Sequence, residues 1–162
     1  MSRAVITPLD VPPPPAPTLD GDWALRPLVT EEPAVRAYAV TPSGGGTPVQ
    51  LRLYRVQHHP LRACYPHGAH DIAVQLVPAE AAESPAAQLL NALVPALFTA
   101  DPLCRRVVAA PAEDDTAAQA AFEAGGFRRV TEADLPTGTV VLFTTEPSWL
   151  ADLPTALDDM PH

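Results

Sequence analysis

The chain has 162 residues, 47% of them hydrophobic, which is enough for one domain with a buried core and excludes an intrinsically disordered protein. Ten basic residues, all arginine, face 19 acidic ones, and the formal net charge of −9 argues against nucleic acid as the main partner. Two cysteines without dense spacing do not suggest a secreted disulfide framework, and no apolar run reaches the length of a membrane span, so a cytoplasmic protein is expected.

Composition divides the chain into three segments. Residues 1–20 are rich in proline and are expected to form a flexible or polyproline arm. Residues 21–146 carry the periodic apolar patterns of a folded domain. Residues 147–162 form an acidic tail, in which a last helical turn is expected around Trp149 and Leu150.

The first predicted element is a strand. Trp23, Leu25 and Leu28 give it an alternating apolar pattern. A short helix is expected within residues 31–40. The glycine-rich stretch 41–48 is typical of a hairpin loop.

Two further strands are expected on either side of a loop. Residues 49–55 alternate between apolar and polar side chains, which is typical of a half-buried strand. Residues 72–78 have a longer apolar run and predict another strand. The connection between them, residues 58–71, contains four histidines and one cysteine and is expected to be a loop.

A helix is predicted after the strand at residues 72–78. Ser84 and Pro85 are the residue types favoured at the N-cap and at the first helical position. Apolar residues then recur at helical spacing as far as Phe98. Pro95 is expected to kink or restart this helix, because proline removes a backbone donor and crowds the preceding turn.

The stretch from Arg105 to Val130 predicts a strand, a loop, a helix and a second strand in close succession. Residues 107–109 form a buried run, and the alanine-rich residues 117–124 have high helix propensity. Two strands joined by a Pro-Thr-Gly turn are expected at residues 128–135 and 139–145. The resulting order, β–β–β–α–β–α–β–β, predicts a mixed α/β fold.

The ends of the second helix carry capping signals. Residues 114–116 are N-cap residue types, and Gln119 is spaced as the capping-box partner of Thr116. Gly125 or Gly126 offers a left-handed C-terminal cap. This arrangement places a helix N-terminus beside the end of a strand, where anionic ligands are often held.

The spacing of Pro111, Asp115, Glu123, Gly126 and Phe127 resembles the C-terminal half of the GCN5-related N-acetyltransferases (GNAT). The resemblance implies a GNAT-like mixed central sheet flanked by helices, with strands that splay to admit the pantetheine of coenzyme A. In that family two helices separate the first two strands. Here residues 29–46 are too few for both, which implies a shortened N-terminal helical region and an acceptor side that is open or completed by a partner.

The middle of the chain narrows the resemblance. Residues 47–144 are similar to the siderophore lysine N-acyltransferases of the aerobactin and mycobactin type. Such relatives move an acyl group from acyl-CoA to a lysine-type or N-hydroxylated amine. The matching positions are Tyr54, Pro60, Leu61, Tyr65, Asp71, Leu76 and Pro78, followed by Leu97, Phe98, Asp101, Pro102, Arg106 and Pro111.

The resemblance also implies candidate site residues. The branch's catalytic histidine falls on Gln75 and its carboxylate helper on Ala112, and Asp115 is a second candidate catalytic residue. An amide can orient a substrate, but it cannot accept the proton as a general base does. Acyl-CoA as co-substrate is implied at four positions, namely Val77, Ser84, Ala86 and Ala87.

Several functions stay open at this point. One is acyl transfer to a small-molecule amine acceptor. A second is a catalytically inactive GNAT-fold protein that binds a protein of the same pathway, because the segment from Pro78 to Ser84 has no glycine where relatives cradle a pyrophosphate. A metal site at Cys64, His67 and His70 is a third, but a solvated histidine-rich loop is favoured over it, so no metal is expected.

Overall fold

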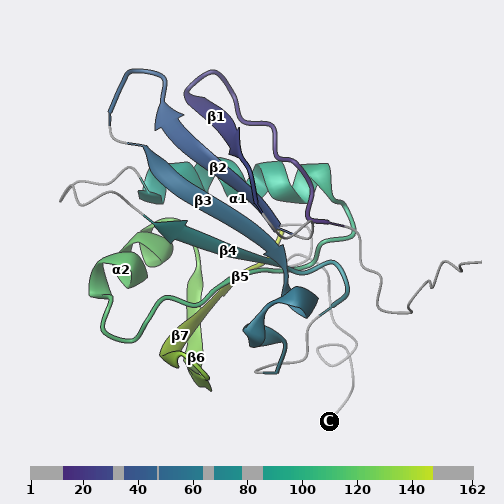
Figure 1. Cartoon of the computed structure of the whole chain (residues 1–162), viewed down its shortest axis with the longest axis vertical. Helices are drawn as coiled ribbons and strands as arrows, with labels where there is room; N and C mark the ends of the chain where they lie inside the picture. The colour runs from purple at the N-terminus through teal and green to yellow at the C-terminus, as the bar shows by residue number, and fades with distance from the viewer. Residues whose placement is uncertain (1–12, 31–34, 47, 64–67, 78–85, 148–162) are drawn as a thin grey trace, which may run out of the picture.

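The computed structural model describes residues 13–30, 35–46, 48–63, 68–77 and 86–147. These described residues form a seven-stranded mixed sheet of order β1-β2-β3-β4-β5-β7-β6 and two α-helices (Figure 1), which confirms the expected mixed α/β class. The elements are β1 (Trp23–Leu28), β2 (Val35–Pro42), β3 (Val49–Arg55), the 3-10 turns η1 (Val56–His58) and η2 (Pro60–Ala63), β4 (Ile72–Val77), α1 (Ala86–Ala100), β5 (Val107–Ala109), α2 (Thr116–Ala124), β6 (Arg128–Leu135) and β7 (Gly138–Thr145).

Strand β2 corrects the expected helix within residues 31–40. From Val35 onward the chain is extended and pairs antiparallel with β1 on one side and with β3 on the other. Val35, Ala37 and Val40 are buried. Pairing along both edges outweighs the high helix propensity of the alanine and arginine residues in this segment. Between β1 and β2 the described residues therefore contain no helix.

Strands β4 and β5 are parallel neighbours that separate after two residue pairs. Ile72 pairs with Val107 and Ala73 with Val108, and β4 makes no further pair with β5 from Val74 onward. On its other side β5 pairs with β7 along its whole length, as far as Ala109 with Phe143. The sheet is therefore open between the second half of β4 and the segment that follows β5.

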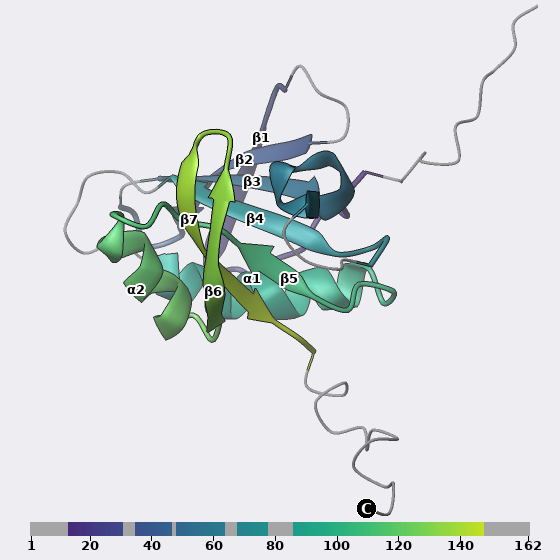
Figure 2. The same ribbon diagram turned by 90° about the horizontal axis from the view of Figure 1, so that it is seen from below.

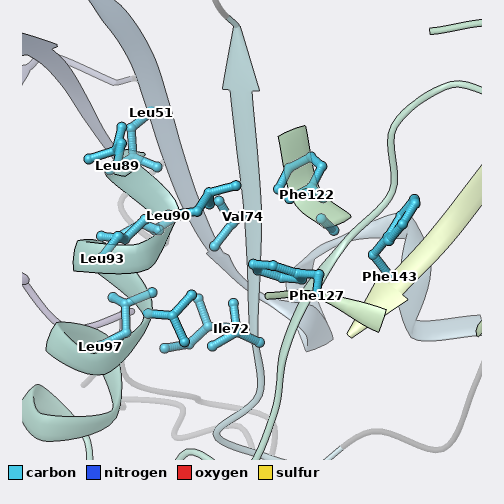
Figure 3. Packing of buried hydrophobic residues seen from close by; sticks show 14 of the residues in the cluster. Leu51, Ile72, Val74, Leu89, Leu90, Leu93, Leu97, Phe122, Phe127 and Phe143 are labelled. Atoms are coloured by element: carbon cyan, nitrogen blue, oxygen red, sulfur yellow. The ribbon is translucent and has the colours of Figure 1, made fainter. Parts of the chain in front are cut away.

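Both α-helices pack on one face of the sheet, and the η1 and η2 turns lie on the other (Figure 2). The buried side of α1 is a stripe of leucines that meets β3 and β4, and Phe122 of α2 extends the same core (Figure 3). Burying one leucine side chain contributes about 1.5–3 kcal/mol to stability, so this stripe is what mainly holds α1 on the sheet. The labelled core residues of the two helices are Leu89, Leu90, Leu93, Leu97 and Phe122.

Helix α1 is continuous from Ala86 to Ala100, so the restart expected at Pro95 does not occur. Pro95 lies on the exposed side of the helix, away from the leucine stripe. Its ring therefore points into solvent and leaves the packing of α1 on the sheet intact.

The opposite face has a smaller apolar cluster. Val56 of η1 and Leu61 of η2 are buried against Ala73 of β4, Val108 of β5 and Leu142 of β7. The turns thus cover the place where β4 and β5 begin to separate. Because successive strand residues point to opposite faces, Ala73 belongs to this cluster while its neighbours belong to the helix-side core.

The caps of α2 differ in detail from the expected capping box. Asp115, and not Thr116, is the N-cap, and its Oδ1 accepts a hydrogen bond from the backbone N–H of Ala118 at 3.1 Å. Gln119 donates to two backbone carbonyls of the loop before the helix, each at 2.9 Å. The residue in the left-handed conformation after the helix is Gly126, with φ of 96°. It is one of the two glycines that were expected to form this cap.

The proline-rich segment contacts the sheet over its described part. Arg55 donates to the carbonyl oxygen of Pro13 at 3.3 Å, and Arg36 donates to that of Pro14. Pro14 is buried. The expected division into residues 1–20, 21–146 and 147–162 stays a prediction, since the first twelve residues and the tail around Trp149 lie outside the described residues.

Candidate functional site

A cavity of about 420 Å³ lies where β4 and β5 separate. Strand β4 lines it with residues 73–77, and the segment at the end of β5 lines it with residues 109–112. The N-terminal half of α2 and its cap form one wall, and the turns η1 and η2 contribute His59 and Leu61. Four of the lining residues are alanines of these strands and loops, and their small side chains keep the cavity open.

The cavity is lined from both faces of the sheet. Ala73 packs with Leu61 in the cluster beneath the turns, whereas Val74 packs with Phe122 in the core beneath the helices. All four residues line the cavity. The separation of β4 from β5 thus makes an opening that reaches across the sheet.

Gln75 lies on the turn side of this opening. Its side chain is exposed, and its Oε1 accepts a hydrogen bond from the Tyr54 hydroxyl at 3.2 Å. Tyr54 comes from β3, one strand further from the opening. The amide oxygen is therefore engaged, and the amide nitrogen is the end of Gln75 that can donate to a ligand.

His59 is a cavity residue that is not among the site residues expected from the sequence. Its Nδ1 accepts a hydrogen bond from the backbone N–H of Leu61 at 3.1 Å. Its ring meets that of Tyr54 edge to face, with centroids 5.1 Å apart. Burial lowers the pKa of His59 below its usual value, because the charged ring would lose its hydration. No sequence signal marks this histidine, since its place beside the opening comes from the path of η1 and η2.

The remaining sequence-based candidates fall into three groups. Val77, Ala112 and Asp115 line the cavity together with Gln75. Ala86 and Ala87 begin α1 and are not among the lining residues, and Ser84 lies outside the described residues. Asp115 is engaged as the cap of α2, so a catalytic role for it, like the role of Gln75, stays a prediction.

A buried ion pair anchors the chain around the turns. Arg55 and Asp101 approach to 2.8 Å, and Arg55 also donates to the carbonyl oxygen of His70 at 2.7 Å. Burial alone would raise the pKa of Asp101, but the hydrogen bond and charge of Arg55 bring it below its usual value. The pair ties the end of β3 to the loops that precede β4 and follow α1.

The expected absence of a metal stays a prediction. Within the described ranges, no three side chains of the metal-binding types are grouped closely enough to hold an ion. Cys64 and His67, two of the three ligands considered, lie outside those ranges. His70 instead places its Nδ1 at 3.3 Å from the carboxylate of Asp101.

Neither α1 nor α2, the helices in the described part of the chain, is long and apolar enough to cross a membrane.

A family model described as an acetyltransferase (GNAT) domain matches residues 29–135. Among curated proteins, no sequence gives a significant match.

Solved structures share the fold at low sequence identity. An uncharacterised protein from Bacillus halodurans superposes with a TM-score of 0.64 and 22% identity over 72% of this chain, which spans only 61% of that protein's length. The aminoglycoside acetyltransferase AAC(6')-Ib, in complex with paromomycin and acetyl-CoA, superposes with a TM-score of 0.62 and 17% identity, over 75% of this chain and 70% of that one. Spermidine N-acetyltransferase from Vibrio cholerae superposes with a TM-score of 0.56 and 12% identity, over 82% of this chain and 98% of that one.

Proposed function

Since the chain belongs to the GNAT acetyltransferase domain family, we propose that it transfers an acyl group from acyl-CoA to an amine. The observation that carries this proposal is the separation of β4 from β5 and the cavity of about 420 Å³ that it opens. A cavity of this size is typical of small-molecule sites, which measure roughly 300–1,000 Å³.

The cavity suits the extended arm of coenzyme A. From Val74 onward the edge of β4 that faces β5 has no partner among the described strands, so its backbone groups are placed to bond an extended ligand. Pantetheine is such a ligand, because it carries two amides along a flexible chain. Ala109 and Ala110 on the opposite wall leave space for it.

An amine acceptor is supported by two observations. The solved relatives named aminoglycoside acetyltransferase and spermidine N-acetyltransferase have amine-bearing molecules in their names. Among the described residues that line the cavity, Asp115 is the one carboxylate, and no arginine accompanies it. The cavity therefore favours a basic acceptor over an acidic one.

We further propose the finer assignment, a lysine-type or N-hydroxylated amine of siderophore biosynthesis. Its support is the sequence resemblance over residues 47–144, which includes Tyr54, Leu61 and Leu76. Leu61 and Leu76 line the cavity, and Tyr54 contacts Gln75 beside it. A cytoplasmic location would give the protein access to acyl-CoA and to such an amine.

The reaction joins the amine nitrogen to the carbonyl carbon of the thioester. The carbon–sulfur bond then breaks, coenzyme A leaves as its thiol, and the amine loses one proton. Gln75 and Ala112 cannot accept that proton, and the carboxylate of Asp115 is engaged as the N-cap of α2. The acceptor therefore reacts as the free amine, its proton passes to water, and the rate rises with pH until the acceptor is fully deprotonated.

A catalytically inactive binding protein is the second candidate. It is favoured by Gln75 and Ala112, because both stand where the related branch has its histidine and carboxylate and both line the cavity. Such a protein would keep the cavity and bind a protein of the same pathway. It would show no acyl transfer.

Calorimetric titration with acetyl-CoA and longer acyl-CoAs, followed by a thiol-release assay with lysine and N6-hydroxylysine, separates the two. Heat of binding together with amine-dependent thiol release supports the enzyme. Binding without thiol release favours the inactive protein. The absence of both binding heat and thiol release would overturn the proposed function.

A cavity-filling variant makes this test specific. Ala110→Phe places a large ring in the opening and is expected to abolish acyl-CoA binding. Ala24→Phe, on exposed β1, is the matched control and should bind as the wild type does. Equal binding by both variants would show that acyl-CoA occupies another place.

A further inference from the structure

His59 lies at the closed end of the opening between β4 and β5. Its ring contacts that of Tyr54, and Tyr54 pairs across the sheet with Ala73, the last β4 residue that still pairs with β5. Leu61, whose backbone bonds the His59 ring, packs against Ala73 on the same face. A ligand that enters from the wide end, beside Val77, therefore brings its tip toward His59.

The hydrogen bond to Leu61 decides which ring nitrogen of His59 carries the proton. Nδ1 accepts from a backbone N–H, so in the neutral ring the proton is on Nε2. Burial of the ring favours this neutral form, because the charged ring would lose its hydration. Asp115 is the one other ionisable residue lining the cavity, and its carboxylate caps α2, while Tyr54 meets the ring with its edge.

At Nε2 this neutral histidine is a hydrogen-bond donor and not a base, because that nitrogen already holds a proton. The lone pair of Nδ1 is engaged by the backbone N–H of Leu61, so neither nitrogen is placed to take a proton from the amine. Nε2–H can, however, donate to an oxygen that becomes negatively charged. Donors aimed at such an oxygen are among the largest contributions to acyl-transfer catalysis.

We propose that Nε2–H of His59 donates a hydrogen bond to the thioester carbonyl oxygen and stabilises the oxyanion formed when the amine attacks. The inference rests on the proposed function. The ring keeps its proton throughout: the nitrogen–carbon bond forms, the carbon–sulfur bond breaks, and the oxygen returns to a carbonyl as the thiol leaves. His59 is thus a catalytic residue beside Gln75.

Two substitutions separate this role from a structural one. In His59→Asn the side-chain oxygen takes the place of Nδ1 and keeps the bond to Leu61, but the donor at the Nε2 position is lost. In His59→Gln the amide nitrogen reaches the Nε2 position, but the bond to Leu61 is lost. A structural role therefore predicts that Asn is the better replacement, and the proposed role predicts that Gln is.

The expected result is a fall in kcat of about 100- to 1,000-fold for His59→Asn and His59→Ala, with KM for acetyl-CoA little changed. His59→Gln should retain most of the activity, and exposed Arg62→Gln on η2 should match the wild type. NMR of ¹⁵N-histidine-labelled protein should show His59 protonated on Nε2 at neutral pH. The carbonyl ¹³C signal of bound [1-¹³C]acetyl-CoA should shift between wild type and His59→Asn.

Several outcomes overturn the inference. While the wild type still binds acetyl-CoA, each of four results would overturn it. The first two are higher activity in His59→Asn than in His59→Gln and full activity in His59→Ala. The others are a proton on Nδ1 and an unchanged ¹³C signal in His59→Asn. A wild-type protein that binds no acetyl-CoA overturns the proposed function instead, and the inference falls with it. The two failures are therefore distinguishable.

Discussion

The hydroxyl of Tyr54 donates a hydrogen bond to Oε1 of Gln75 at 3.2 Å, and this bond joins β3 to β4 on the turn side of the cavity. The same tyrosine ring supports His59 from the side. Tyr54 thereby contacts both Gln75 and His59, the first through its hydroxyl and the second through its ring.

Tyr54→Phe is expected to lower kcat/KM about threefold to tenfold, because one hydrogen bond contributes about 0.5–1.5 kcal/mol. The ring contact with His59 is kept, so the melting temperature should change little. Steady-state kinetics of Tyr54→Phe, Gln75→Leu and the double variant form the test. If the tyrosine acts through Gln75, the double variant is no slower than Gln75→Leu alone, and additive losses would contradict that coupling.

Gln75→His combined with Ala112→Asp is expected to raise the acyl-transfer rate at least about tenfold, since a positioned general base contributes 10²–10⁴-fold. Both positions line one cavity, so the new side chains would face the same ligand. The rate of the double variant should rise with pH through about 6.5, the usual pKa of histidine. Each single variant is the control, and no gain in the pair would mean that these positions do not face the amine.

Asp101→Asn is expected to destabilise the fold by about 3 kcal/mol, because it removes the charge of the carboxylate that approaches the buried Arg55 guanidinium to 2.8 Å. Glu132→Gln removes a well-exposed pair with Arg129 and should cost under about 0.5 kcal/mol. Urea unfolding of both variants makes the comparison. Equal costs would contradict the importance of burial for the first pair.

The same carboxylate sets a pH dependence of stability. The folded state lowers the pKa of Asp101, so its stabilising effect is complete above the unfolded pKa of about 3.9 and is lost as the pH falls through the lower folded value. Urea midpoints between pH 3 and pH 7 should therefore decrease at the acid end in the wild type. Asp101→Asn should show a shallower decrease.

Cys104 is expected to resist thiol reagents in the folded protein. Burial raises the pKa of its thiol to about 12, so the reactive thiolate is scarce near pH 8. In a Cys64→Ser background, dithionitrobenzoate should release colour only after denaturant is added. Rapid labelling of the native protein would show that Cys104 is accessible.

Gly125→Ala is expected to destabilise the contact between α1 and α2 by about 1–3 kcal/mol, as overpacking does. A Cβ at this position would lie 2.7 Å from Cβ of Leu90 and 3.2 Å from the carbonyl oxygen of Ala121. Gly21→Ala meets no atom within 4 Å and serves as the control in thermal unfolding. Equal melting temperatures for the two variants would contradict the close approach of the helices.

Local patterns in the sequence predicted most of the elements, but not β2. The apolar stripe of α1 and the alternation of β3 are properties of a few neighbouring residues, and both are confirmed. Residues 35–42 form a strand because β1 and β3 flank them, and that arrangement depends on pairings distant in sequence.

The candidate site shows the same division. The family resemblance pointed to Gln75 and Ala112, and the structure brings both to one cavity. The sequence did not predict His59 as a donor, because the residues next to it in the chain do not indicate that it lies close to Ala73 and Tyr54. Its role requires the hydrogen bond from Leu61, which exists only once η1 and η2 have turned over the sheet.

The opening that reaches across the sheet also bears on the order of events in the proposed reaction. The cavity is lined by Gln75 from one face of the sheet and by Phe122 from the other, so in that reaction an acyl donor and an amine would be bound at once. Neither substrate has to depart before the other arrives. The acyl group would then pass directly between two bound molecules in a ternary complex, without a covalent intermediate on a side chain.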